Sequence, residues 1–200
     1  AVYCTGRSIR GAPATEGRAE TIEGTAEMVT ADGGVGIHVQ TDHTVAEQVE
    51  ALFRRVVAEQ GGLDILVNDV WGGDALTEWG VPFWELDPEK GRTMQERAVW
   101  SHILTSRYGV PLMLGRGDGL VVEITDGDSH DYRGNLHYDL AKISAIRLAH
   151  AMAEELKEAG ITSVALTPGF LRSETMLDHF GVTEANWRDG AKQDPHFIAS

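Results

Sequence analysis

The chain has 200 residues, of which 42% are hydrophobic, and its formal net charge is −14 at pH 7. This length and apolar content suit one domain with a sizeable core. The negative charge argues against nucleic acid or an anionic membrane as a partner, since phosphate groups would repel it. No apolar run approaches the roughly 18 residues that span a bilayer, and the single cysteine, Cys4, excludes a disulfide framework and fits a reducing, cytoplasmic setting.

Five short apolar runs predict five β-strands, at residues 1–5, 36–41, 63–68, 120–125 and 161–167. Three of them contain bare apolar triplets, which are typical of strands covered on both faces; these are Ile65-Leu66-Val67, Leu120-Val121-Val122 and Val164-Ala165-Leu166. Helical patterns separate the runs, and such alternation favours βαβ crossovers. We therefore expect residues 1–200 to form a single α/β domain, with a doubly wound parallel sheet and helices on both faces.

Four segments between the strands have helical patterns. Residues 15–31 are helical by composition but contain Gly17 and Gly24, whereas residues 42–61 have a clear apolar face. Asp42 or Thr44 is the expected N-cap of the second segment, and Gly61-Gly62 is its expected end. Residues 89–114 predict one long helix, and the segment from 138 to about 158 predicts an amphipathic one. The expected inward positions of these two helices are Val99, Ile103, Leu104, Tyr108, Ala145, Ala149, Met152 and Leu156.

Two aromatic segments interrupt this alternation, at residues 70–92 and 170–200. Both follow the carboxyl ends of strands, where ligands bind in open α/β sheets. Their aromatic residues could line a substrate pocket, or they could pin long loops as satellite clusters. Both interpretations stay open for the large apolar side chains of the two segments, Trp71, Trp79, Phe83, Trp84, Phe170, Met176, Phe180, Trp187 and Phe197.

Tyr138 and Lys142 lie four residues apart near the start of the last predicted long helix, so both side chains lie on one helix face. A strand and a short polar loop precede them, and a strand that ends in Pro168-Gly169 follows. In this context the pair resembles the Tyr-x-x-x-Lys motif of the short-chain dehydrogenase/reductase family. The resemblance implies a Rossmann-like fold and an NAD(P)-dependent oxidoreductase that moves a hydride between nicotinamide C4 and a carbonyl or alcohol.

The resemblance also gives Tyr138 and Lys142 their roles. Tyr138 would be the general acid in reduction and the base in oxidation, although a phenol with a pKa of about 10 is a poor base at pH 7. The Lys142 ammonium at about 4 Å would stabilise the phenolate by about 4 kcal/mol at an effective dielectric constant of ~20. This is enough to lower the pKa of the phenol to near neutral pH, before the opposing effect of desolvation. Lys142 would also hold the nicotinamide ribose.

Three residues match the adenosine side of the family's cofactor site. Arg7 follows the first strand, where an arginine pairs with a 2′-phosphate, so NADP(H) is favoured and NAD(H) stays possible. Asp42 matches the acid that hydrogen-bonds the adenine amino group; the simpler interpretation is a helix N-cap, and it could serve as both. Asn68 matches the first residue of the family's Asn-Asn-Ala-Gly turn, from which Asp69 and Val70 depart.

On the nicotinamide side, Pro168-Gly169 resembles the family's Pro-Gly segment. The hydroxyl residue five positions after the proline, Ser173, would contact the nicotinamide carboxamide. An ordinary turn after a strand is the simpler interpretation of Pro-Gly.

The sequence also departs from the family pattern. The glycine-rich phosphate loop after the family's first strand is absent, so the residues given resemble the middle of a member, one strand and one helix later than its start and without its last strand. Without that loop a pyrophosphate would lack its helix N-terminus. Ala98 stands where the family usually has a proton-relay asparagine, so a water must serve or the relay is absent.

The position of the family's catalytic serine is ambiguous. Counting back thirteen or twelve residues from Tyr138 gives Thr125 or Asp126, and Ser129 is a third possibility. We expect Thr125, because its neutral hydroxyl can donate to a substrate oxygen. An ionised Asp126 cannot donate and would raise the pKa of Tyr138, so we expect it to turn away or to be protonated.

The remaining predictions concern ligands and partners. No metal is predicted, because the acidic loop 126–131 lacks calcium-loop spacing and no His-x-x-x-His or Cys-x-x-Cys pattern occurs. A small carbonyl or alcohol is the expected substrate, and a homodimer or homotetramer is implied by the resemblance, with Ala141, Ala145 and Ala149 suited to close helix approach. The alternatives are a catalytically impaired binding or scaffolding protein and an unrelated flavodoxin-like or receiver-like domain.

Overall fold

All five expected strands are present in the computed structural model, which describes residues 1–12, 20–127, 131–169 and 171–194. They are β1 (Val2–Gly6), β2 (Gly36–Gln40), β3 (Ile65–Asn68), β4 (Gly119–Ile124) and β5 (Ile161–Leu166). Every observed pairing is parallel, which confirms the α/β class with parallel strands. Within the described ranges the strands pair as two sets, β1–β2 and β3–β4–β5, so β1 and β3 each keep one edge without a strand partner.

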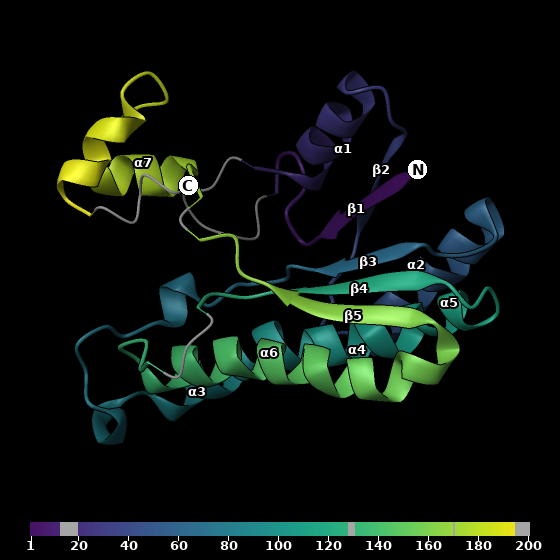
Figure 1. Ribbon diagram of the computed structural model, residues 1–200. Helices are drawn as coiled ribbons and strands as arrows, with labels where there is room; N and C mark the ends of the chain where they lie inside the picture. The colour runs from purple at the N-terminus through teal and green to yellow at the C-terminus, as the bar shows by residue number, and fades with distance from the viewer. Residues whose placement is uncertain (13–19, 128–130, 170, 195–200) are drawn as a thin grey trace.

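The helices lie on both sides of these strands. Figure 1 shows α4 (Ser101–Gly109) and α6 (Leu136–Leu156) below the three-stranded sheet and α1 (Ile22–Ala31) above β1 and β2. Helix α2 (Ala46–Gln60) packs beside α4. The main core lies between these helices and the sheet and contains Val49, Phe53, Leu66, Leu104, Met113, Val121, Leu156 and Ile161.

The ends of α1 and α2 show which sequence signals predicted the helix boundaries correctly. Thr21 caps α1, where its hydroxyl accepts a hydrogen bond from the Gly24 N–H; the expected start near residue 15 lies outside the described residues. Helix α2 ends at Gly61, whose φ of 78° is left-handed, as predicted. Its N-cap is Val45, without a side-chain bond, so the expectation of an Asp42 or Thr44 cap is wrong.

The predicted helix over residues 89–114 is broken. It consists of α3 (Pro88–Gln95), a π-helical turn η3 (Glu96–Trp100), α4 and a short α5 (Pro111–Leu114). Pro111 has no N–H to continue the ladder, which explains the break before α5. The π turn shifts the helix register, and Ile103, which we expected inside, is 37% exposed.

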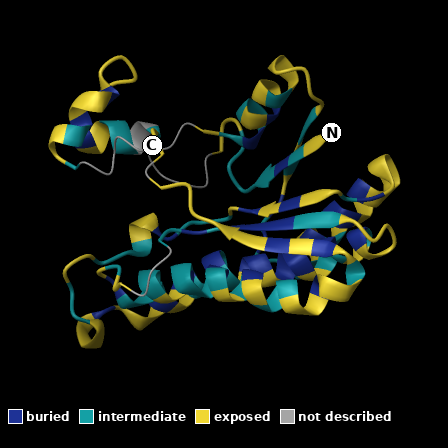
Figure 2. Ribbon diagram, viewed as in Figure 1, coloured by how far each residue is buried: buried dark blue, intermediate teal, exposed yellow. Residues whose placement is uncertain are grey.

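One face of the three-stranded sheet is exposed along β3 and β5, contrary to the expectation that these strands are covered on both faces. Ile65 and Val67 of β3 are 57% and 55% exposed, and Val164 and Leu166 of β5 are exposed too. Figure 2 shows these exposed positions along β3 and β5. The triplets of β3 and β5 therefore do not mark strands covered on both faces in the described part of the chain. In β4 the adjacent Val121 and Val122 are both buried, so the expectation holds there.

The small residues of α6 also serve a different contact from the one expected. Ala141, Ala145 and Ala149 are buried within the chain, where α6 packs on β4 and β5. Their small side chains let the helix approach the sheet closely, so they are not available to a second subunit. The exposed apolar residues of the same layer are Trp100, Ile103 and Leu140.

Shorter elements complete the chain. The 3₁₀ turns are η1 (Asp74–Leu76), η2 (Phe83–Glu85), η4 (Lys157–Ala159) and η5 (Trp187–Lys192), and α7 (Glu174–Phe180) follows β5. In the parts of the chain that the structure describes, no helix combines the length and apolarity that crossing a membrane requires.

Gly109 provides a test of the packing between α2, α4 and β3. A Cβ at this position would lie 2.8 Å from Phe53 Cζ and 3.1 Å from Leu66 Cδ2. We expect Gly109→Val to lower the free energy of unfolding by about 1–3 kcal/mol through overpacking. Gly115→Val is the control, because a Cβ there meets nothing within 4 Å and should change stability by less than about 0.5 kcal/mol. Urea unfolding measures both, and equal effects would contradict the packing described.

Candidate active site

The start of α6 is fixed by Asn135. Its side-chain oxygen accepts hydrogen bonds from the N–H groups of His137 and Tyr138, at 3.0 and 3.1 Å. Its amide nitrogen donates to the carbonyl of Glu78 at 3.0 Å. Asn135 therefore caps the helix and ties it to the segment 70–92, so that Tyr138 and Lys142 emerge beside that segment.

Tyr138 donates its hydroxyl proton to Oδ2 of Asp126 at 2.5 Å. The same carboxylate forms an ion pair with Arg133, also at 2.5 Å. The phenol ring lies between two indoles, with centroid distances of 5.5 Å to Trp71 and 5.2 Å to Trp79. The first aromatic segment thus contributes to the surroundings of Tyr138, as one of its two interpretations proposed.

Lys142 lies against the Trp71 ring, and among the described residues its ammonium forms no hydrogen bond with the Tyr138 hydroxyl. Its ammonium nitrogen is 3.8 Å from the centroid of the Trp71 ring and 5.4 Å from that of Tyr138. Burial lowers the pKa of Lys142, and the carboxylates of Asp126, Asp69 and Asp74 oppose that shift. The lysine is therefore held by a cation–π contact within an acidic neighbourhood.

The expected effect of Lys142 on the phenol is wrong for this arrangement. Burial, the hydrogen bond to Asp126 and the charge of Asp126 raise the pKa of Tyr138 well above its usual value of 10.0. Asp126 faces Tyr138, which contradicts the first of our two expectations for it, that its side chain turns away; the second, that it is protonated, stays a prediction. The carboxylate accepts the phenolic proton directly, so it outweighs the more distant ammonium.

Thr125 has another partner. Its hydroxyl donates to the backbone carbonyl of Lys142 at 2.7 Å, and the residue is buried. Thr125 therefore ties the end of β4 to α6, and the position next to the Tyr138 hydroxyl is taken by Asp126. This corrects the preference for Thr125 over Asp126; Ser129 lies outside the described residues.

The adenosine-side residues meet in one cleft. A cavity of about 790 Å³ is lined by residues from both ends of β1 and β3, by the α2 side chains Leu52, Phe53 and Val56, and by the start of the β2–α2 connection. Arg7, Asp42 and Asn68 all line it. Burial opposes ionisation of Asp42, but hydrogen bonds from the Thr44 N–H and hydroxyl, aided by the charge of Arg7, hold its pKa below the usual value.

Gly72 shapes the same end of the cleft. Its φ is 145°, and a Cβ there would meet Arg97 Cδ at 3.2 Å and the Arg7 guanidinium at 3.4 Å. Arg97 also donates to the carbonyl of Gly72 at 3.1 Å. Two guanidinium groups therefore approach one turn, so the cleft can receive an anionic group such as a phosphate.

The nicotinamide-side residues are less closely gathered. Pro168 and Gly169 follow β5, and Gly169 has a φ of 70°. Ser173 caps α7, where its hydroxyl accepts from the Met176 N–H at 3.4 Å. No contact among the described residues joins Ser173 to Tyr138 or Lys142.

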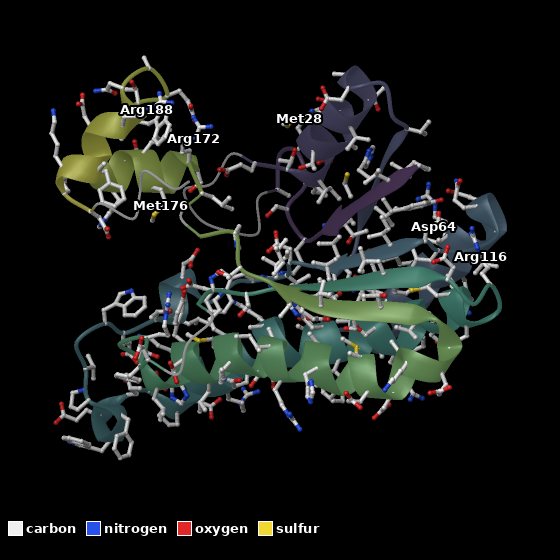
Figure 3. All side chains as sticks on the ribbon, in the orientation of Figure 1. Met28, Asp64, Arg116, Arg172, Met176 and Arg188 are labelled. Carbon is white, nitrogen blue, oxygen red and sulfur yellow. The ribbon has the colours of Figure 1, made fainter. Side chains whose placement is uncertain are left out.

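The second aromatic segment forms a satellite cluster around Phe180, Val182 and Trp187. Arg172 and Arg188 lie 4.7 and 4.4 Å from the Trp187 ring centroid, and Figure 3 shows both beside α7. This favours the loop-pinning interpretation for the described part of this segment; Phe170 and Phe197 lie outside the described residues.

Ala98 is buried in the π-helical turn beside Ala141 and Met94. A cavity of about 20 Å³ lies next to Ala98, Lys142 and His102, which is large enough for one water molecule. The position that resembles the family's relay asparagine is thus Ala98, next to a small cavity that also borders Lys142.

Sequence reasoning missed a buried polar group behind this site. Asn68, Glu123, His102 and Ser106 are all buried and hydrogen-bonded to one another. One signal was available, because Glu123 interrupts an otherwise apolar strand. Within the described ranges no group of three or more His, Cys, Asp or Glu side chains could hold a metal ion.

Known proteins resemble this chain over most of its length. A family model described as short chain dehydrogenase matches residues 12–180. "Dehydrogenase/reductase SDR family member 1" is 31% identical over 92% of the chain in Homo sapiens and 30% identical over 98% in Mus musculus. The chain spans 56% and 58% of those two relatives, just over half their length. A crystal structure of a short-chain dehydrogenase from Streptomyces avermitilis has a TM-score of 0.67 and 26% identity, covering 78% of this chain and 56% of that one.

The contact between Asp126 and Tyr138 predicts a measurable titration. Asp126→Asn removes the negative charge and leaves Arg133 without its partner, and both changes favour the phenolate. We expect the pKa of Tyr138 to fall clearly, and Asp74→Asn to lower it much less, because Asp74 is the weaker influence. Ultraviolet titration of phenolate, taken as the difference between each protein and its Tyr138→Phe counterpart, measures this. Equal shifts for the two variants would contradict the geometry.

Proposed function

Because the chain belongs to the short-chain dehydrogenase family, we propose that it carries the catalytic part of an NAD(P)-dependent oxidoreductase acting on a small carbonyl or alcohol. The observation that carries the proposal is the pair Tyr138 and Lys142, one helical turn apart on α6 and both in contact with Trp71. The aromatic surroundings suit an organic substrate.

Tyr138 is the proposed general acid in carbonyl reduction. The phenol is protonated at neutral pH, so a proton is available to the substrate oxygen, and the raised pKa means that Asp126 and burial hold this proton more tightly than water would. The substrate oxygen must replace Asp126 as the acceptor of that proton. Once the proton has left, the Lys142 ammonium favours the phenolate electrostatically.

We favour Asp126 over Thr125 as the group beside the substrate oxygen, because Thr125 already donates to the Lys142 carbonyl. Arg133 neutralises part of the Asp126 charge. When bound, the nicotinamide supplies or accepts a hydride at its C4.

The cleft fits the adenosine end of such a cofactor. Arg7 would pair with a 2′-phosphate, which favours NADP(H), and Asp42 would accept from the adenine amino group. Asn68 would support the turn at this end, while Pro168, Gly169 and Ser173 would approach the nicotinamide. No metal is proposed. The exposed Trp100, Ile103 and Leu140 would pair with a second copy in a homodimer or homotetramer.

A catalytically impaired binding protein is the second candidate. The contact of Asp126 with Tyr138 favours it, because an ionised carboxylate both occupies the phenol and opposes a developing alkoxide. The two functions separate in one experiment: the enzyme binds NADPH and reduces a carbonyl, whereas the impaired protein does not turn over.

The first prediction concerns proton transfer. Tyr138→Phe should remove carbonyl reduction and leave NADPH binding largely intact, because only the acid is lost. Lys142→Ala should weaken both. Tyr132→Phe is the matched control, since Tyr132 is an exposed tyrosine in the adjoining loop. Absorbance of NADPH with a panel of aldehydes and ketones measures turnover, and calorimetry measures binding. If Tyr138→Phe keeps more than a few per cent of the activity, Tyr138 is not the acid.

The second prediction concerns cofactor choice. A charge-assisted bond from Arg7 to the 2′-phosphate is typically worth about 1.5–3 kcal/mol. Arg7→Asp should therefore weaken NADPH binding by about 10–150-fold and abolish or reverse the preference over NADH. Arg10→Asp is the control, because Arg10 is an exposed neighbour that pairs with Glu27 at 2.8 Å. Calorimetric titration with both cofactors is the test, and equal wild-type affinities would remove the assignment.

A further inference from the structure

A carboxyl group lies at the centre of the three-stranded sheet. Glu123 of β4 has 0% exposure and is the register partner of Asn68 on β3, so the two side chains lie on the same face of the sheet. Oε1 of Glu123 accepts from Asn68 Nδ2 at 2.6 Å, and Oε2 lies 2.6 Å from Nδ1 of His102 on α4. Asn68 also donates to the hydroxyl of Ser106 at 2.9 Å.

The partners of His102 determine where its protons lie. Nε2 is 3.0 Å from the carbonyl oxygen of Val70, which can only accept, so Nε2 must carry a proton. Nδ1 and the Glu123 oxygen cannot face each other as two lone pairs at 2.6 Å, so one proton lies between them. The pair of side chains is therefore neutral as a whole, whichever atom holds that proton, and this limits the cost of burying it.

The hydrogen bond to Val70 connects this buried group with the candidate active site. Val70 begins the turn after β3, and the next residue is Trp71. The Trp71 ring lies under the Lys142 ammonium at 3.8 Å and meets the Tyr138 ring edge-on at 5.5 Å. Two further contacts hold this segment: the Trp71 indole N–H donates to Asp74 at 2.7 Å, and Arg97 donates to the Gly72 carbonyl.

We propose that His102, oriented by Glu123, is a positioning residue that fixes the Val70–Trp71 backbone and thereby the places of Lys142 and Tyr138. Glu123 selects the histidine orientation and keeps Nε2–H directed at the carbonyl. The carbonyl then sets where the indole stands, and the indole face holds the ammonium beside the phenol. The effect on turnover rests on the proposed oxidoreductase function, whereas the effect on Trp71 does not.

The test follows Trp71 itself. The chain has five tryptophans, and comparison with Trp71→Phe identifies the Trp71 indole N–H signal in a ¹H–¹⁵N spectrum. We expect His102→Leu and Glu123→Leu to shift or broaden this signal. Glu123→Gln should preserve it, because a glutamine can accept from Asn68 and donate to Nδ1, which leaves Nε2–H on the Val70 carbonyl. A long-range ¹H–¹⁵N spectrum of the wild-type protein should show His102 protonated at Nε2.

A second buried histidine provides the control. His43 is buried like His102 and contacts the hydroxyls of Thr5 and Thr105, both at 2.9 Å, without a contact to Val70. His43→Leu should lower stability and leave the Trp71 signal in place. In turnover, His102→Leu should lower kcat by about 10–100-fold, the usual consequence of a small misplacement of reacting groups. NADPH affinity should fall less than kcat, because Lys142 is displaced but Arg7 and Asp42 lie outside the network.

The outcomes separate the positioning role from the proposed function. An unchanged Trp71 signal in His102→Leu overturns the positioning role, as does a wild-type His102 without a proton at Nε2. If Glu123→Gln disturbs the Trp71 signal as much as Glu123→Leu does, the role of Glu123 in orienting His102 is overturned. If Trp71 moves as expected but the wild-type protein reduces no carbonyl, the positioning role stands and the oxidoreductase proposal fails. If the leucine variants do not fold, the wild-type spectrum still tests the first link, because a His102 without a proton at Nε2 overturns the proposal.

Discussion

The burial of the Glu123 carboxyl group constrains much of this structure. A carboxyl without partners inside a protein costs several kcal/mol, so the fold must supply donors at fixed places. Asn68 on β3 and His102 on α4 supply them. Meeting this requirement sets the register of β3 against β4 and the height of α4 on the sheet. The apolar core around Leu66, Leu104 and Val121 requires the same placement of β3, β4 and α4. The polar network and the apolar packing therefore favour the same arrangement.

Around Tyr138, by contrast, the charges oppose one another. Asp126 holds the phenolic proton, Arg133 moderates the charge of Asp126, and Lys142 stays on the face of Trp71. A site arranged in this way favours the protonated phenol over the phenolate.

Parallel strands explain why residues far apart in sequence face one region. Arg7, Asp42 and Asn68 each follow or end a strand, and all parallel strands bring their carboxyl ends to the same edge. The family resemblance implied that these three residues share one side of the site, whereas local patterns predicted the strands and the helical face that joins Tyr138 to Lys142. Periodicity and glycine stops are local signals, and for this reason the end of α2 at Gly61 was also predictable.

The sequence by itself determined the α/β class, the parallel strands, the family resemblance and the Tyr138–Lys142 pair, because each depends on spacing along one element. Only the tertiary structure decided which group meets the phenol, since Thr125 and Asp126 are neighbours and their direction depends on α6 and the loop that precedes it. It also decided that Ile65 and Val67 are exposed and that Ala141 and Ala145 are buried. The link from Glu123 through His102 to Val70 joins three separate elements. No pattern within one element can encode such a contact, because it exists only when β3, β4 and α4 are packed together.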